Sequence, residues 1–102
     1  KWYTKIGDEY TSGNYYYGQK IDTWETYYYP EMRIKSKTNY LDSKKSGNHK
    51  AYYFNKKLKE VGIYSNDLKS GKWTYFRSDG NIDYTAEYSR GELIKINDLH
   101  IK

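Results

Sequence analysis

The side chains in this 102-residue chain that could do acid–base chemistry are two histidines and a few neighbouring carboxylates. General acid–base catalysis needs titratable groups that converge within hydrogen-bonding reach of a substrate. The nearest carboxylate neighbours are Asp8 with Glu9 and Asp22 with Glu25, which we interpret as surface charges. His100 lies close to the end of the sequence, where we expect it to be solvated.

Motifs that would organise such groups into a site are missing. The sequence has no cysteine, which excludes disulfides and thiolate metal sites. It also has no glycine-rich phosphate loop, nucleophile elbow or metal-ligand spacing. The segment 65–71, SNDLKSG, offers oxygen ligands but too few carboxylates for calcium. We therefore predict a protein that is not an enzyme and uses no metal or cofactor.

The apolar part of the composition is mostly aromatic. The chain contains 15 Tyr, 3 Trp and 2 Phe, and tyrosine makes up much of its 36% hydrophobic fraction. A tyrosine ring packs well on a half-buried sheet surface while its hydroxyl stays in water. Because amphipathic helical runs are missing, this composition predicts an all-β protein built from thin sheet.

Charge and hydropathy limit the possible partners. The formal net charge is +5, but the lysines are interspersed with acids and the densest basic run is SKKSGNHK, 43–50. Such mild basicity favours an ordinary solvated surface over a nucleic-acid footprint. No apolar run is long enough to span a membrane. The chain begins without Met, so we expect a processed chain from which any targeting segment has been cut away, in the cytoplasm or the cell envelope.

One motif recurs along the chain with a period of 24 or 25 residues. If Trp24, His49 and Trp73 are aligned, each has an aromatic residue three positions later and a tyrosine nine positions earlier. His49 thus stands where the other units have Trp, so we interpret it as a structural ring and not as a catalytic group. The recurring tyrosines are Tyr15, Tyr40, Tyr64 and Tyr88, and the residues two before them are Gly13, Thr38, Gly62 and Ala86.

Each unit is predicted to be a β-hairpin. Its first strand is the aromatic run, such as 72–76, and its second strand is 34–40, 58–64 or 82–88. Between Ser78 and Asn81, Asp79-Gly80 is the expected type I′ turn, while YPEM and FNKK replace it in earlier units. The segment 65–71 is expected to be a loop leading to the next unit.

Side-chain alternation separates the two faces of the second strands. It places Ile34, Leu58 and Ile82 on the same face as the small residues and the tyrosines. The small residues are expected to leave room for rings from the neighbouring strand. Lysines, acids and a few aliphatic residues occupy the other face, which is expected to be mostly solvated.

These features predict a single all-β domain over residues 1–102, an elongated antiparallel meander of about four β-hairpin repeats. The units cover about 9–31, 32–56, 57–80 and 81–93, and 94–102 forms a C-terminal cap. Leu93, Ile94 and Ile96 are expected to lie in a capping strand or a short helix.

The segment KLKEVGIYSNDLKSGKWTYFRSDGNI, 57–82, resembles the bacterial variant of the MORN repeat found in YwqK-type proteins of the antitoxin class. The resemblance extends over about residues 9–93, and its best unit carries Leu58, Lys59, Gly62, Tyr64, Gly71, Trp73, Phe76 and Gly80. Earlier units depart from the motif: His49 replaces Trp, Thr38 replaces the strand Gly, and Glu31 and Lys56 replace the turn Gly. The resemblance implies an open β-meander that presents an interaction surface, and an antitoxin role is the most specific form of that function.

A second similarity, to choline- or glucan-binding repeats, rests on GKWTYFRSDGNI, 71–82. Those repeats run near 20 residues and carry a second Trp that completes an aromatic cage for a quaternary ammonium. This chain lacks that Trp and has a longer period. Cell-wall or carbohydrate binding is therefore the alternative function, and single-stranded nucleic-acid binding is a weaker one.

The candidate binding residues lie near the predicted hairpin turns. Aromatic rings are enriched at protein interfaces, and adjacent lysines favour an acidic protein partner. Charge reversal at the lysines is expected to slow association, and removal of an aromatic ring such as Tyr53 to speed dissociation. The candidate residues are Tyr28, Tyr29, Tyr53, Phe54, Lys50 and Lys56.

Overall fold

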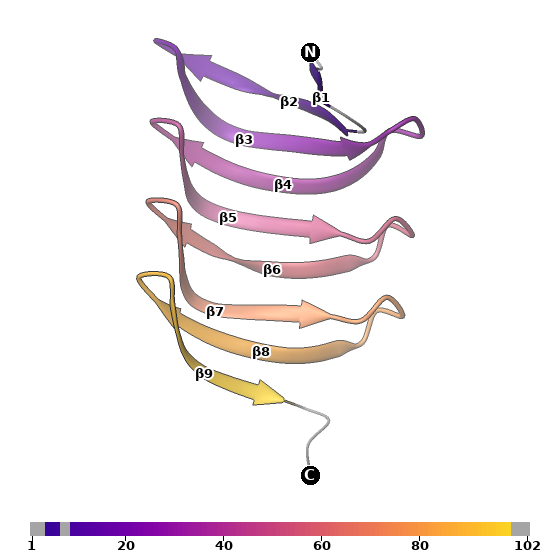
Figure 1. The fold of residues 1–102 in the computed structure, drawn as a ribbon, viewed down its shortest axis with the longest axis vertical. Helices are drawn as coiled ribbons and strands as arrows, with labels where there is room; N and C mark the ends of the chain where they lie inside the picture. The colour runs from indigo at the N-terminus through magenta and orange to yellow at the C-terminus, as the bar shows by residue number, and fades with distance from the viewer. Residues whose placement is uncertain (1–3, 7–8, 99–102) are drawn as a thin grey trace.

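The computed structural model describes residues 4–6 and 9–98, which form nine strands in one antiparallel sheet. The strands lie in sequence order and each pairs with the next, so the chain is a simple meander (Figure 1). No helix occurs in the described part of the chain. The strands are β1 (Thr4–Ile6), β2 (Glu9–Tyr16), β3 (Gln19–Tyr28), β4 (Arg33–Leu41), β5 (Lys44–Tyr52), β6 (Leu58–Ser65), β7 (Leu68–Phe76), β8 (Ile82–Ser89) and β9 (Glu92–Asp98).

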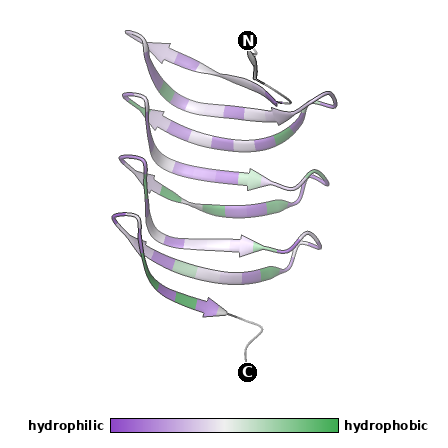
Figure 2. Cartoon of the chain, in the orientation of Figure 1, coloured by the Kyte–Doolittle hydropathy of each residue, from purple (hydrophilic) through white to green (hydrophobic). Residues whose placement is uncertain are grey.

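The sheet is a single curved layer that measures 48 × 31 × 18 Å (Figure 1). No other element of the described chain covers either face. Hydropathy colouring shows only short hydrophobic segments on otherwise neutral or hydrophilic strands (Figure 2). The predicted all-β antiparallel meander is confirmed, whereas the count of about four units stays a prediction.

The tight turns differ from those predicted. Two-residue turns join β2 to β3, β4 to β5, β6 to β7 and β8 to β9, and both central residues have positive φ, as a type I′ turn requires. The segment 65–71 is therefore mostly strand and not a loop, because only Asn66 and Asp67 form the turn. The turn residues are Tyr17 and Gly18, Asp42 and Ser43, Asn66 and Asp67, and Arg90 and Gly91.

The prediction of a type I′ turn at Asp79-Gly80 is wrong. Gly80 has φ +96° but Asp79 is not among the residues with positive φ. The Gly80 N–H donates to the Arg77 carbonyl and the Arg77 N–H donates to the Asn81 carbonyl. This pattern is a type I turn followed by one left-handed residue, the usual form of a three-residue hairpin loop.

Lys56 occupies the position of Gly80 in the preceding loop. Its φ is +75°, and its N–H donates to the Tyr53 carbonyl at 2.9 Å. Glu31, by contrast, does not take this conformation in the first loop, where Met32 has φ +60°. A lysine in the left-handed region is strained because its Cβ approaches the following carbonyl oxygen.

Lys56→Gly should therefore stabilise the fold by about 1 kcal/mol, since glycine adopts positive φ without that strain. Urea denaturation would measure the gain. The reverse change, Gly80→Ala, should cost a similar amount at the matched position. A destabilised Lys56→Gly variant would show that the lysine side chain makes a compensating contact.

The prediction that the aliphatic residues share a face with the small residues and the tyrosines is also wrong. The register shifts by one residue at the start of each second strand, so that Tyr27 pairs with Ile34, Tyr52 with Leu58 and Phe76 with Ile82. Paired residues point to the same side of a sheet, and a one-residue slip reverses that side. The aliphatic residues therefore lie on the face opposite Trp24, His49 and Trp73. We call the side of the sheet that carries these three rings the Trp face.

Packing on the Trp face depends on small residues beneath the rings, as predicted. A Cβ atom at Gly62 would lie 2.0 Å from the Trp73 ring, and one at Gly13 would lie 2.1 Å from the Trp24 ring. Each indole N–H then donates to a backbone carbonyl one residue further along the neighbouring strand, Asn14 for Trp24 and Ile63 for Trp73, at 3.1 Å. Trp73 is fully buried in spite of the single layer.

The small residue beneath each ring is larger where the side chain above it is smaller. Glycine lies under each Trp of these pairs, Thr38 pairs with the smaller His49, and Ala86 pairs with Ile96. The C-terminal segment 92–98 is thus a capping strand, one of the two predicted forms, and Ile96 takes the position of a ring. Residues 99–102 of the predicted cap lie outside the described residues.

Candidate functional site

A column of alternating lysine and tyrosine residues runs across the Trp face. Lys20, Lys45 and Lys69 each lie at the second position of β3, β5 and β7. Tyr40 pairs with Lys45 and Tyr64 pairs with Lys69 across the sheet. We call this set the lysine–tyrosine column; its members, in strand order from β3 to β8, are Lys20, Tyr40, Lys45, Tyr64, Lys69 and Tyr88.

Each lysine ammonium lies over aromatic rings. The Lys20 Nζ is 4.6 Å from the Trp24 ring centroid and 5.1 Å from that of Tyr40. The Lys45 Nζ is 5.0 Å from the Tyr64 centroid, and the Lys69 Nζ is 5.0 Å from the Tyr88 centroid. Cation–π attraction of this kind holds an ammonium in place. All three lysines are half-buried, and the Lys69 ammonium also donates to the Tyr75 hydroxyl at 3.0 Å.

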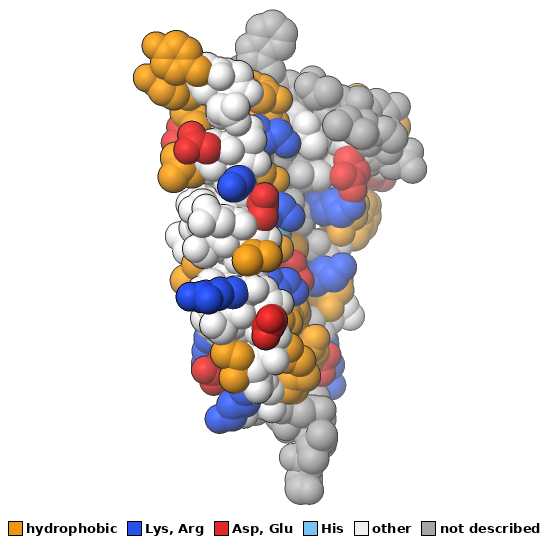
Figure 3. Space-filling model, turned by 60° about the vertical axis from the view of Figure 1, so that its left-hand side comes forward, with side chains coloured by type: hydrophobic (Ala, Val, Ile, Leu, Met, Phe, Trp, Pro, Cys, Tyr) orange, Lys and Arg blue, Asp and Glu red, His pale blue; other side chains and the backbone are white. Residues whose placement is uncertain are grey.

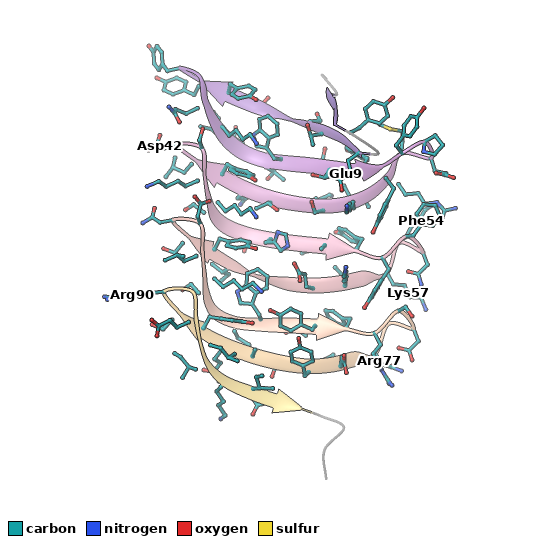
Figure 4. The ribbon with its side chains drawn as sticks, viewed as in Figure 1. Glu9, Asp42, Phe54, Lys57, Arg77 and Arg90 are labelled. Atoms are coloured by element: carbon teal, nitrogen blue, oxygen red, sulfur yellow. The ribbon has the colours of Figure 1, made fainter. Side chains whose placement is uncertain are left out.

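Turns of the sheet contact the backbone of the column. The Ser43 N–H donates to the Lys20 carbonyl, and the equivalent bonds from Asp67 to Lys45 and from Gly91 to Lys69 are both 2.9 Å long. Three of the four two-residue turns are therefore hydrogen-bonded to the backbone of the preceding column lysine. These turns lie at one end of the strands, and we call each such end of the strands an edge of the sheet. Asp42 and Arg90 mark this edge in Figure 4. Lysine and arginine side chains are interspersed with acidic ones along that side of the molecule and form no continuous basic patch (Figure 3).

The hydroxyls of Tyr40, Tyr64 and Tyr75 on this face keep their protons. Burial raises the pKa of Tyr40 and of Tyr64, and Tyr75, which also hydrogen-bonds Tyr88, has its pKa raised well above the ordinary value by burial and by that bond. A protonated phenol can donate to a carbonyl. The column therefore presents cations and neutral hydroxyl donors side by side.

The predicted binding residues lie mainly at the opposite edge of the sheet, where the longer loops join the strands. Tyr28 packs edge-on against Phe54 with centroids 5.3 Å apart, and Tyr29 lies 5.4 Å from Tyr10. Arg33 lies 4.5 Å over the Phe54 ring and donates to the Phe54 carbonyl. Phe54 and Tyr29 remain exposed at 45% and 40%. The loops carry Phe54, Lys57 and Arg77 at this edge (Figure 4).

Two of the predicted residues have a structural role in the described fold. The Tyr28 hydroxyl donates to the Tyr52 carbonyl, and the Tyr53 hydroxyl donates to the Phe76 carbonyl at 2.6 Å. Each bond joins one hairpin to the next. Tyr53→Ala therefore weakens the fold as well as any binding surface, and Phe54→Ala is the cleaner probe of this edge.

The two predicted lysines are not together. Lys56 is exposed in the loop between β5 and β6, whereas Lys50 lies within β5 and pairs with Lys37 on the face opposite the Trp face. There Lys50 lines an open hollow of about 240 Å³ with Thr23, Lys37, Asn39 and Asn48. The six predicted residues therefore form no single surface, although five of them lie at one edge.

His49 is the centre of a buried polar array. Its Nδ1 lies 2.6 Å from the Thr38 hydroxyl, and its Nε2 lies 2.8 Å from the Glu60 carboxylate. A carboxylate can only accept, so Nε2 donates to Glu60 and, in a neutral ring, Nδ1 accepts from Thr38. Hydrolases use hydroxyl, imidazole and carboxylate in such an array. Here Thr38 and His49 are each 6% exposed, which leaves the hydroxyl inaccessible to a substrate and favours a structural role.

The Glu60 carboxylate makes stability depend on pH. The hydrogen bond from His49 lowers the pKa of Glu60, assisted by the charges of His49, Lys69 and Lys59 and opposed by burial. A carboxyl whose pKa is lower in the folded state stabilises the fold above its unfolded pKa, and this contribution is lost as the pH falls through the folded value.

The difference in unfolding free energy between the native chain and Glu60→Gln should therefore shrink as the pH falls from 6 to 3. Thermal or urea denaturation across that range would measure it. Glu87→Gln, at an exposed position of β8, controls for the change in net charge. A difference that stays constant over the range would contradict the ionic role of Glu60.

Sequence reasoning missed the lysine–tyrosine column, although a signal for it was present. Lys20, Lys45 and Lys69 recur at intervals of 25 and 24, the same period as the tyrosines. The repeat defined by the rings does not include these lysines, which composition alone presents as scattered charge. Their common face follows from the register.

No group of three or more metal-ligating side chains occurs among the described residues. The described part of the chain also contains no helix that is long and apolar enough to cross a membrane.

The fold and the site together define an open single-layer β-meander with an uncovered face of lysines and tyrosines. The chain matches no protein-family model and no curated protein. The similarity to MORN-type repeats therefore rests on the motif in the sequence.

Proposed function

We propose that this chain is a non-enzymatic protein-binding module of the MORN-variant type, and that its lysine–tyrosine column binds an acidic segment of a partner protein. The observation that carries the proposal is the repetition of one ammonium per hairpin over aromatic rings on an uncovered face. Rigid aromatic rings contribute binding energy with little loss of conformational entropy. Lysines beside them speed the encounter with an acidic surface. An antitoxin or immunity-type inhibitor is the narrower form of this proposal.

The burial of Trp73 bears on the carbohydrate alternative. A sugar or a quaternary ammonium needs a free ring face, but the Trp73 side chain is fully buried and Lys69 lies 4.8 Å over it. Trp24 is half-buried, with Lys20 over its ring. The accessible chemistry of the face is therefore that of lysine ammonium groups and tyrosine edges, which favours an anionic partner.

The proposal can be tested with poly-L-glutamate as a model acidic chain, with oligo-dT and choline as competitors from the other two classes. The chain should bind poly-L-glutamate in a salt-dependent way, because charge pairs at a surface are screened by salt. The triple variant Lys20→Gln, Lys45→Gln and Lys69→Gln should weaken binding at least about tenfold.

A matched control removes three lysines from the opposite face, with the same change in net charge. Lys37, Lys50 and Lys72 pair with residues of that face and are exposed. Replacing them by Gln should change affinity less than threefold. Equal losses in the two triple variants would show attraction by net charge alone and would overturn the proposed site, and tighter binding of oligo-dT or choline would assign the face to the other ligand class.

Affinity purification from the source cells with the tagged chain tests the narrower form. One stoichiometric protein, inhibited by the chain, would make it a dedicated inhibitor. Recovery of envelope fragments without a protein would instead support cell-wall binding.

A further inference from the structure

The spacing of the lysines restricts the conformation of the acidic segment. Consecutive lysines of the column lie two strands apart, and neighbouring strands are about 4.8 Å apart, so the backbone positions that carry the ammonium groups repeat at about 9.6 Å. A ligand that pairs with all three must carry one carboxylate about every 9.6 Å on one side. The column continues as Leu93, which pairs with Tyr88, so the run of cations ends at Lys69.

Regular peptide conformations differ in the distance between successive side chains that point to the same side. In a β-strand, side chains on one side recur every second residue, at about 6.7 Å. In an α-helix, neighbours three or four positions apart on one face lie about 5–6 Å from each other. A polyproline II helix has three residues per turn and rises about 3.1 Å per residue, so every third side chain points the same way at about 9.3 Å. Of these nearest-neighbour spacings, only that of the polyproline II helix matches the lysines. Positions seven apart on one face of an α-helix, about 10.5 Å, fit less closely.

The tyrosines between the lysines fit the same ligand. Proline-rich segments in this conformation bind surfaces lined with aromatic side chains, and their backbone carbonyls have no internal hydrogen bonds. Tyr40 lies between Lys20 and Lys45, and Tyr64 lies between Lys45 and Lys69. These half-buried rings can pack against the two residues between successive acids. Their protonated hydroxyls can donate to the free carbonyls.

We infer that the lysine–tyrosine column binds a polyproline II segment with an acidic residue at every third position, of the form Glu-Pro-Pro-Glu-Pro-Pro-Glu. The three carboxylates pair with Lys20, Lys45 and Lys69, and the prolines pack on the tyrosine rings. This inference rests on the proposed function and adds to it the spacing and conformation of the ligand. No new covalent step is involved.

Fluorescence anisotropy with labelled peptides tests the spacing. The peptide EPPEPPE should bind at least about tenfold more tightly than EPEPEPP and EEEPPPP, which have the same composition and charge in other orders. The neutral peptide QPPQPPQ should bind at least about tenfold more weakly than EPPEPPE. The preference for EPPEPPE should disappear in the triple variant of the column lysines and persist in the triple variant of the opposite face.

The possible failures are distinguishable. Equal binding of the three acidic peptides, lost in the column variant, would overturn the spacing and leave the acidic-partner proposal standing. A preference for EPEPEPP would show that acids at every second position fit the column better and would also overturn the inference. Absence of binding to every acidic peptide and to poly-L-glutamate would overturn the inference and the proposed function together. Thermal denaturation of each triple variant confirms that a loss of binding is not a loss of folding.

Discussion

Gly62→Ala should destabilise the fold by about 3 kcal/mol or more, because the added methyl has no room. A Cβ atom at Gly62 would lie 2.0, 2.2 and 2.6 Å from three carbons of the Trp73 ring. Trp73 is fully buried and its indole N–H is bonded to the Ile63 carbonyl, so the ring cannot move away without losing both. A flexible side chain could yield at such a contact, but a packed indole cannot.

Urea denaturation of Gly62→Ala and of Gly71→Ala would measure this effect. Gly71 has φ +69° and nothing within 4 Å of its added Cβ, so its variant reports the backbone strain of alanine alone, about 1–2 kcal/mol. Gly62 has no positive φ, so its variant reports the clash alone. If Gly62→Ala costs less than Gly71→Ala, the ring does not pack on the glycine as described.

His49→Trp should destabilise the fold by about 1–3 kcal/mol even though Trp is the residue of the other units. The neighbouring small residue in this unit is Thr38, which is 6% exposed and hydrogen-bonded to the His49 ring. A Trp in the arrangement of Trp73 would meet the Thr38 side chain and leave its hydroxyl buried without a partner, and a buried unpaired hydroxyl costs free energy. Histidine and threonine are a matched pair at this position.

Thr38→Gly should be destabilising alone but should rescue His49→Trp. The double variant restores the glycine and Trp arrangement seen at Gly13 with Trp24 and at Gly62 with Trp73. A double-mutant cycle by urea denaturation should give a favourable coupling of about 1–3 kcal/mol. Glu60, whose side chain is 25% exposed, can turn to solvent when His49 is replaced. Additive effects of the two changes would show that ring and base are not coupled.

The periodic positions were the most reliable part of the sequence prediction. The 24–25-residue period located the hairpins, the rings and the small residues beneath them, since each of these depends on contacts between adjacent strands. His49 was placed in a Trp position on the same ground, and the structure puts it between Thr38 and the rings of Tyr64 and Trp73. The repeat in the sequence thus predicts most of the fold.

The sequence is a poorer guide to the type of turn and to the face of the sheet on which a residue lies. Asp79-Gly80 is the strongest type I′ signal in the sequence, yet the loop around it is longer and takes a different form. One bulge in each of three hairpins then reverses the face of Ile34, Leu58 and Ile82. A one-residue register shift leaves no distinct trace in composition, because it is set by how two strands and their loop fit together.

The sequence by itself determined an antiparallel meander of aromatic hairpins, because spacing and alternation are properties of the chain. Only the tertiary structure decided which residues share a surface. Stacked turns align Lys20, Lys45 and Lys69 into one column, while Lys50 lies on the other face and the Tyr28 and Tyr53 hydroxyls bond the backbone of the next hairpin. The physical reason is that faces and columns follow from strand register, and register is fixed by how each strand and its connecting loop fit against the next strand.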